Sequence, residues 1–168
     1  MNYIDFDNVI LDTSLPIFKD YHDKSKIGTF IDDANYVMQK DWAQILRESP
    51  IINDGIEIIK TLDIAQNCIL TKIHSLTNEG SSKIIFLREK GIECPIILVP
   101  YNVSKTDVVN AKDNVLVDDN LLNLNEWYQK GGLPIFFSKD DLDVDAYGRK
   151  NTIYPKTRTL KILRQYQK

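Results

Sequence analysis

Short apolar runs alternate along the chain with helical patterns. The runs are rich in Ile and Val and are not interrupted by polar positions, as is typical of strands buried on both faces. Between them, apolar residues recur at helical spacing in 52–62, where Asp54 and Glu57 have the spacing of a capping box. Segments 77–90 and 120–130 each end at a glycine, a common helix stop. Strands separated by helices predict an α/β fold with a parallel, Rossmann-like sheet. The predicted strands are residues 3–7, 67–71, 95–99, 114–118 and 134–137.

The interval between the first two predicted strands is longer than this alternation of strands and helices requires. About sixty residues separate the first two predicted strands, whereas one crossover needs far fewer. The surplus, residues 15–50, contains aromatic residues in helix-compatible surroundings. We predict a small helical cap inserted after the first strand, over the carboxyl edge of the sheet. The α/β core then comprises residues 1–14 and 51–168.

Composition places the chain among soluble globular proteins. Its 168 residues are 43% hydrophobic and 27% charged, which is sufficient for one domain with its own core. Cys68 and Cys94 lie beside apolar runs and are expected to be reduced, buried thiols, which predicts a cytoplasmic location. No run approaches the ~18 apolar residues of a membrane span, so no membrane partner is expected.

Charge is distributed unevenly. The net charge is −3, but seven basic residues and no acid lie between Arg149 and Lys168. The acidic remainder excludes a uniformly basic nucleic-acid binder. Within the basic tail, Leu160, Leu163 and Tyr166 recur every third residue, which predicts a final helix with its apolar side against the sheet. Nucleic acid is therefore not expected as a partner.

Acidic residues end two of the predicted strands. Asp5 and Asp7 close the first strand, and Asp118 and Asp119 close the fourth. Ligands of doubly wound sheets bind at the carboxyl ends of strands, so the four carboxylates are expected to meet at one edge. They would repel one another without a cation, and all-oxygen ligands favour Mg²⁺ or a similar hard ion.

Two further residues complete the candidate chemistry. Thr71 ends the second strand, where its hydroxyl could bind a phosphate oxygen. Lys105 follows the third strand and would oppose the carboxylates and a phosphate. Lys112 also precedes the fourth strand and is the alternative to Lys105 for this role. Lys105 is preferred because its loop reaches the carboxyl edge of the sheet more easily. His22 and His74 lack metal-ligand spacing. His74 follows Thr71 closely enough to lie near the site, but a packing or surface role is expected of it.

Together these segments resemble the haloacid dehalogenase (HAD) superfamily. The stretch from Ile4 to Thr13 is similar to its first motif, and Ile69-Leu70-Thr71 is similar to its second. Lys105 matches the third motif, and Val115-Leu116-Val117-Asp118-Asp119 matches the fourth. Asn8 departs from the first motif, which often has glycine there. Residues 118–137 further resemble the 5′-nucleotidase and deoxyribonucleotidase branch.

The resemblance implies a mechanism and a sheet order of 3-2-1-4-5. Asp5 would attack phosphorus and form an aspartyl-phosphate, and Asp7 would act as general acid and then as general base. Mg²⁺ would be held by the Asp5 carboxylate, the Asp7 backbone carbonyl and Asp118, with Asp119 as a weaker or water-mediated contact. Thr71 and Lys105 would hold the phosphoryl oxygens.

The expected substrate is a small-molecule phosphomonoester, with a nucleoside monophosphate favoured. A sugar-phosphate or phosphoprotein phosphatase of the same superfamily is one alternative, and a non-catalytic phosphate- or nucleotide-binding module is another. A cap selects the leaving group in such enzymes. Its aromatic residues could stack on a base, although most are expected to pack against the core. The sequence leaves the oligomeric state open. The cap aromatics are Phe18, Tyr21, Tyr36 and Trp42.

Overall fold

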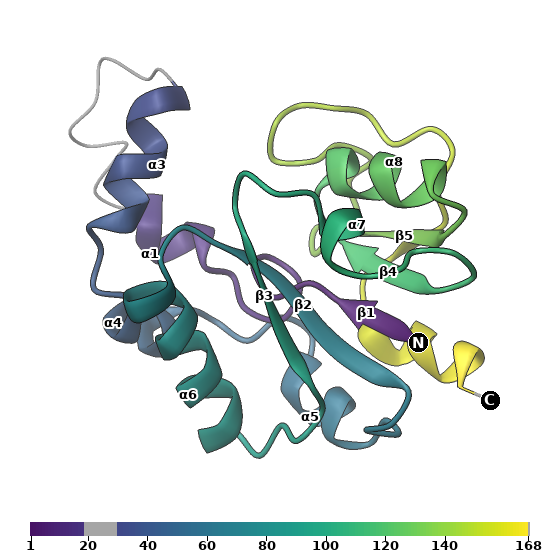
Figure 1. The fold of residues 1–168 in the computed structure, drawn as a ribbon, viewed down its shortest axis with the longest axis horizontal. Helices are drawn as coiled ribbons and strands as arrows, with labels where there is room; N and C mark the ends of the chain where they lie inside the picture. The colour runs from purple at the N-terminus through teal and green to yellow at the C-terminus, as the bar shows by residue number, and fades with distance from the viewer. Residues whose placement is uncertain (19–29, 168) are drawn as a thin grey trace.

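A six-stranded parallel sheet organises the molecule (Figure 1). The computed structural model describes residues 1–18 and 30–167. The strand order is β3-β2-β1-β4-β5-β6, which confirms the predicted arrangement of five strands and adds a sixth at the edge. The strands are β1 (Asn2–Ile4), β2 (Asn67–Ile73), β3 (Ile96–Pro100), β4 (Val115–Asp118), β5 (Leu133–Phe137) and β6 (Lys156–Thr157).

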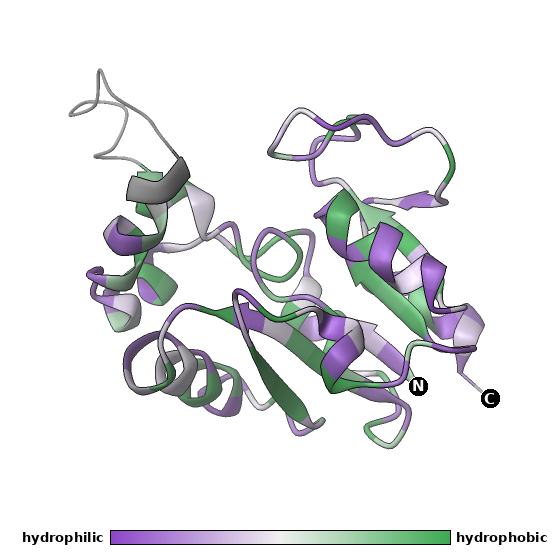
Figure 2. Ribbon diagram, turned by 45° about the horizontal axis from the view of Figure 1, so that its top comes forward, coloured by the Kyte–Doolittle hydropathy of each residue, from purple (hydrophilic) through white to green (hydrophobic). Residues whose placement is uncertain are grey.

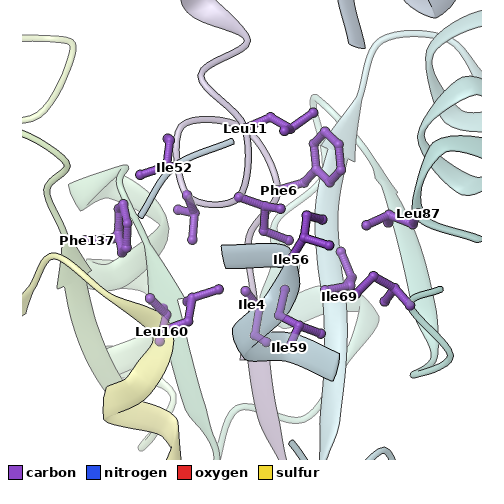
Figure 3. Packing of buried hydrophobic residues seen from close by; sticks show 14 of the residues in the cluster. Ile4, Phe6, Leu11, Ile52, Ile56, Ile59, Ile69, Leu87, Phe137 and Leu160 are labelled. Carbon is purple, nitrogen blue, oxygen red and sulfur yellow. The ribbon is translucent and has the colours of Figure 1, made fainter. Parts of the chain in front are cut away.

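Both faces of the sheet carry a hydrophobic core, because successive strand residues point to opposite faces. In β1, Tyr3 belongs to one buried cluster and Ile4 to the other. The cluster around Ile4 includes residues of α5 (Gly55–Lys60), α6 (Ser81–Glu89) and the 3₁₀-helix η2 (Leu160–Tyr166) (Figure 3). The cluster around Tyr3 includes residues of α8 (Leu121–Gln129), which contacts α7 (Lys105–Val108).

The hydropathy of the elements matches this layering. Figure 2 shows the sheet strands as mostly hydrophobic, with hydrophilic residues along the flanking helices. The helices α4, α5 and α8 bury mainly apolar residues in the core, while their charged residues are exposed or partly exposed. Among the described residues, no helix is both long and apolar enough to cross a membrane.

A helical region follows β1, as predicted. It comprises α1 (Ser14–Phe18), α3 (Phe30–Met38) and α4 (Trp42–Glu48). In Figure 1, α1 and α3 lie on the side of the strands' carboxyl ends, whereas α4 lies beside α6, which it contacts. Asn78 of η1 (Leu76–Gly80), the π-helical segment after β2, also donates hydrogen bonds to the backbone carbonyls of Met38, the last residue of α3, and Lys40.

Trp42 is a packing residue of this region. It is 2% exposed, and its Nε1 donates to the carbonyl of Val37 at 3.2 Å, so its ring is not available to stack on a base. Phe18 and Tyr36 are partly buried and pack against the same core. Tyr21 and His22 lie outside the described residues.

Three local predictions need correction. Asp54 does not form a capping box, because it adopts a left-handed conformation (φ 58°) and its side chain makes no cap hydrogen bond. The helix predicted over 77–90 is divided into the π-helical η1 and α6. The first strand ends at Ile4 rather than at Asp7, so the carboxylates of Asp5 and Asp7 are presented by the loop that leaves the strand.

Candidate active site

Asp5 lies where β1 meets β4. Its backbone N–H donates to the carbonyl of Val117 at 2.9 Å, so the sheet fixes its position although the strand has ended. Asp118 is the last residue of the neighbouring β4 and is fully buried. The two acids therefore meet at the carboxyl edge of the sheet, as the sequence predicts.

Lys105 joins these two carboxylates. Its Nζ lies 2.7 Å from Asp5 Oδ1 and 2.7 Å from Asp118 Oδ2, and the residue is 1% exposed. Ser104 caps the short helix α7 and thereby fixes the backbone that presents Lys105. Lys112 is exposed and precedes β4, at the opposite edge of the sheet, so the structure brings Lys105 and not Lys112 to the acids.

Asp118 is held by several donors. The side-chain amide of Asn123, on α8, donates to both oxygens at 3.2 and 3.0 Å. The backbone N–H of Asn120 donates to Oδ1 at 2.8 Å, just before α8 begins. Asn123 lies within the segment that resembles the nucleotidase branch, but its role as a partner of Asp118 was not predicted.

Burial makes the charges of this cluster costly. Desolvation, opposed by Lys105 and reinforced by Asp118 and Asp7, raises the pKa of Asp5 to about 7. Desolvation and the carboxylates of Asp118 and Asp5 raise the pKa of Asp119 well above its usual range. Burial alone would lower the pKa of Lys105, but Asp118 and Asp5 raise it, so this lysine stays charged.

This donor set suits a divalent cation. Carboxylate oxygens of Asp5, Asp118 and Asp119 lie within 4.8 Å of one another. Lys105 is a single cation among three carboxyl groups, and Asp118 and Asp7 add to desolvation in raising the pKa of Asp5. Oxygen ligands with excess negative charge are the environment that Mg²⁺ prefers. The structure thus groups Asp119 with Asp5 and Asp118, whereas the sequence gives it only a weaker contact.

The Asp7 carboxylate is held by a second set of residues. Thr13 Oγ1 donates to Asp7 Oδ1 at 2.8 Å, and Lys83 Nζ donates to Oδ2 at 2.6 Å. Thr71 Oγ1 lies 3.4 Å from Oδ2, so the predicted phosphate-binding hydroxyl lies beside the predicted general acid. The structure therefore assembles Asp5, Asp7, Thr71, Lys105, Asp118 and Asp119 at one edge of the sheet.

Asn8 makes the turn that separates Asp7 from the following loop. It adopts φ 58°, a left-handed conformation that asparagine tolerates better than most residues, so glycine is not required here. Its Oδ1 accepts a hydrogen bond from Ser14 Oγ at 2.7 Å. Asn8, Ser14 and Asp119 line a cavity of about 280 Å³ together with the end of β5 and the following residues 138–146.

Lys83 and Glu79 were not identified from the sequence. Both are buried, and their side chains form an ion pair with Nζ 2.7 Å from Oε1. The available signal was an acid and a lysine four residues apart in a predicted helix. That spacing is common on solvent-exposed helix faces, so it does not by itself indicate a site.

Magnesium is expected to stabilise the folded chain through the acidic cluster. At about 100 times the dissociation constant, an ion that binds only the native state adds roughly 2.7 kcal/mol to the free energy of unfolding. For a chain of this size that corresponds to a rise in Tm of roughly 5–10 °C. Thermal unfolding with and without MgCl₂ measures it. Asp118→Asn should remove most of the rise, while Asp107→Asn, on the exposed first turn of α7, should keep it. An equal rise in both variants would contradict the assignment.

Comparison with known proteins gives structural but not sequence matches. No family model and no curated protein matches the sequence. Among solved structures, a HAD hydrolase of Bacillus subtilis bound to magnesium has a TM-score of 0.60 at 12% identity, covering 98% of this chain and 96% of that one. A haloacid dehalogenase-like family protein of Streptococcus pneumoniae has a TM-score of 0.57 at 12% identity, with 99% and 97% covered.

A third similar structure has a named activity. The D,D-heptose 1,7-bisphosphate phosphatase of Burkholderia thailandensis has a TM-score of 0.51 at 14% identity, covering 94% of this chain and 88% of that one. At these identities the likeness concerns the fold, and it extends over nearly the whole chain, including the helical region after β1. The chain therefore has the fold of the HAD-superfamily hydrolases, as its four motifs predict.

Proposed function

We propose that this chain is a Mg²⁺-dependent phosphomonoester hydrolase that acts through an aspartyl-phosphate on Asp5. The observation that carries the proposal is the buried Lys105 bridge between Asp5 and Asp118, with Asp119 completing an acidic cluster at the carboxyl edge of the sheet. The similarity to a magnesium-bound HAD hydrolase supports the choice of ion. Asp5, Asp118 and Asp119, with the backbone carbonyl of Asp7, would hold Mg²⁺, which would neutralise charge on the phosphoryl oxygens when bound.

The residues have separate tasks in this reaction. Asp5 uses a carboxylate oxygen to attack phosphorus, and the bond from phosphorus to the leaving oxygen breaks. Asp7 protonates that oxygen and later takes a proton from the water that hydrolyses the acyl phosphate. Lys105 and Thr71 stabilise the negative charge on the phosphoryl oxygens. Hydrolysis of the intermediate returns Asp5 to its carboxylate form and releases inorganic phosphate.

As substrates we propose nucleoside monophosphates. The support is the resemblance of residues 118–137 to the 5′-nucleotidase branch, which includes the Asp118 partner Asn123. A sugar phosphate is the second candidate, favoured by the structural similarity to a heptose bisphosphate phosphatase. In either case the leaving group would occupy the cavity of about 280 Å³ between the loop after β1 and residues 138–146.

Phosphate release from a substrate panel tests the proposal. The purified protein is incubated with p-nitrophenyl phosphate, ribo- and deoxyribonucleoside monophosphates and sugar phosphates, with MgCl₂ or with EDTA. We expect release that requires Mg²⁺, is lost with EDTA and returns when Mg²⁺ is restored, with nucleotides the best substrates. Preference for sugar phosphates would favour the second candidate. Binding of nucleotides without release from any compound would favour a non-catalytic binding module and contradict the hydrolase.

A further inference from the structure

Lys83 is a second buried cation next to the candidate catalytic residues. It projects from α6 and is completely buried. Its Nζ lies 2.6 Å from Asp7 Oδ2 and 2.7 Å from Glu79 Oε1. It also lies 3.1 Å from the carbonyl of Lys72 and 3.2 Å from Thr71 Oγ1. An ammonium group has three N–H donors, and these four acceptors engage all of them.

The surroundings of Lys83 separate it from a substrate. The ring of Phe6 lies 5.3 Å from Nζ and the ring of Trp42 lies 5.0 Å from it, so two aromatic side chains enclose the ammonium group. A phosphate would have to displace carboxylate or carbonyl acceptors to reach it. Lys83 can therefore influence the reaction only through the groups it already holds, and Asp7 is the one among them with a proposed proton-transfer role.

Glu79, the second carboxylate that Lys83 contacts, is itself held by hydrogen bonds from His74. Glu79 Oε2 accepts a hydrogen bond from the backbone N–H of His74 at 2.7 Å and lies 3.2 Å from His74 Nδ1. The π-helical turn η1 contains Glu79, and π-turns inside helices often occur at functional sites. Burial alone would raise the pKa of Glu79, but His74 and Lys83 lower it, so the pair stays ionised.

Stability alone is a poor explanation for this ion pair. Desolvating two charges costs as much as their attraction returns in many proteins, and apolar residues of similar volume often serve as well. Here the pair lies directly behind the carboxylate that must meet the leaving oxygen. Asp7 itself keeps 28% of its side chain exposed, so one side of it faces Lys83 and another remains open.

We propose that Lys83 is a positioning residue that fixes the orientation of the Asp7 carboxylate. This inference rests on the proposed function, in which Asp7 transfers protons. Lys83 holds Oδ2 while Thr13 holds Oδ1, so the plane of the carboxylate is set by two donors on different segments. Proton transfer is sensitive to such placement, since a displacement of about 1 Å can cost roughly 10²-fold in rate. Trp42 over the ammonium group also connects the helical region after β1 to this arrangement.

A double-mutant cycle between Lys83 and Asp7 tests the proposal. The substrate is p-nitrophenyl phosphate with saturating MgCl₂, because its good leaving group keeps the turnover of Asp7 variants measurable. Lys83→Met should lower kcat by roughly 10- to 100-fold and leave KM unchanged, since Lys83 does not touch the substrate. In the Asp7→Asn background the same substitution should change kcat by less than about twofold, because the group on which it acts is already lost.

Lys90→Met is the matched control, because Lys90 caps the same helix and is exposed. It should leave kcat unchanged. If losses at Lys83 and Asp7 multiply, or if Lys83→Met mainly raises KM, Lys83 does not act through Asp7 and the proposal is overturned. If Lys83→Met does not fold, Lys83→Gln is used in the same cycle. Its amide can still donate to Asp7, so a smaller loss of kcat is expected, and this loss should again disappear in the Asp7→Asn background. An unsubstituted protein that releases no phosphate from any substrate would instead overturn the proposed function.

Discussion

Asp5→Asn is expected to reduce phosphate release by at least about 10⁴-fold, because losing the nucleophile removes the covalent route as a whole. The amide keeps the size of the side chain and can still accept a hydrogen bond from Lys105, which lies 2.7 Å from Asp5 Oδ1. The loss should appear in kcat with every phosphomonoester, including p-nitrophenyl phosphate, since a good leaving group does not replace an absent nucleophile. Steady-state phosphate release at saturating substrate measures it.

The thermal stability of Asp5→Asn distinguishes loss of the nucleophile from misfolding. The pKa of Asp5 is raised to about 7 by burial, so the folded protein retains a proton that the unfolded chain releases at the ordinary value of 3.8. Stability from this residue is therefore lost as the pH rises from about 4 to 7 in the absence of metal. Asparagine carries no charge at any pH, so without Mg²⁺ at pH 8 the variant should have a Tm at least equal to that of the unsubstituted protein.

Asp107→Asn is the control for this experiment, since Asp107 is an exposed carboxylate close in sequence to Lys105. It should retain full activity. Hydrolysis by folded Asp5→Asn at more than about one hundredth of the normal rate would exclude Asp5 as the nucleophile and point to direct attack by water.

The strand-end acids could be found from sequence because their position depends on chain direction alone. Asp5 and Asp118 each follow an apolar run, and parallel strands end at one edge of a sheet. The order of the strands followed from the family resemblance, and the edge strand β6 was missed. That strand is two residues long, Lys156–Thr157, and its polar sequence gives no apolar run to recognise.

The burial of Lys83 cannot be predicted from its local sequence. Lys105 was found because it follows a strand and has a motif to match. Lys83 lies on a helix with Glu79 four residues before it, a pattern that is usually solvent-exposed. Its burial depends on β2 beneath it and on Trp42 of α4 above it, both distant in sequence. Only the tertiary contact between α4 and α6 converts an ordinary helical pair into part of the site.

The helical region after β1 was predicted as a unit, but its contacts were not. α4 contacts α6, and its Trp42 is buried in the hydrophobic core, so the later part of this region is continuous with the core. An amphipathic pattern predicts that one face of a helix will be buried. It does not predict which element of the fold that face will pack against. The same limit applies to the tail, where buried Leu160 and Leu163 belong to a 3₁₀-helix that contacts α5.

Lys105→Met is expected to impair both activity and stability. Removing one charged donor from the phosphoryl oxygens should lower kcat by about 10²- to 10³-fold. The substitution also leaves Asp5 and Asp118 buried without their shared cation, which should cost about 3–5 kcal/mol in the metal-free protein. Urea unfolding with and without MgCl₂ measures the second effect. Because Mg²⁺ opposes the same carboxylates, it should stabilise this variant more than it stabilises the unsubstituted protein.

Lys112→Met provides the matched comparison, because Lys112 is the other lysine that precedes β4 and is exposed at the opposite edge of the sheet. Its replacement should change the free energy of unfolding by no more than about 0.5 kcal/mol and leave kcat unchanged. The reverse pattern, with activity lost in Lys112→Met and kept in Lys105→Met, would contradict the assignment of Lys105. Loss of stability in Lys105→Met that Mg²⁺ does not reduce would show that the ion and this lysine do not share Asp5 and Asp118.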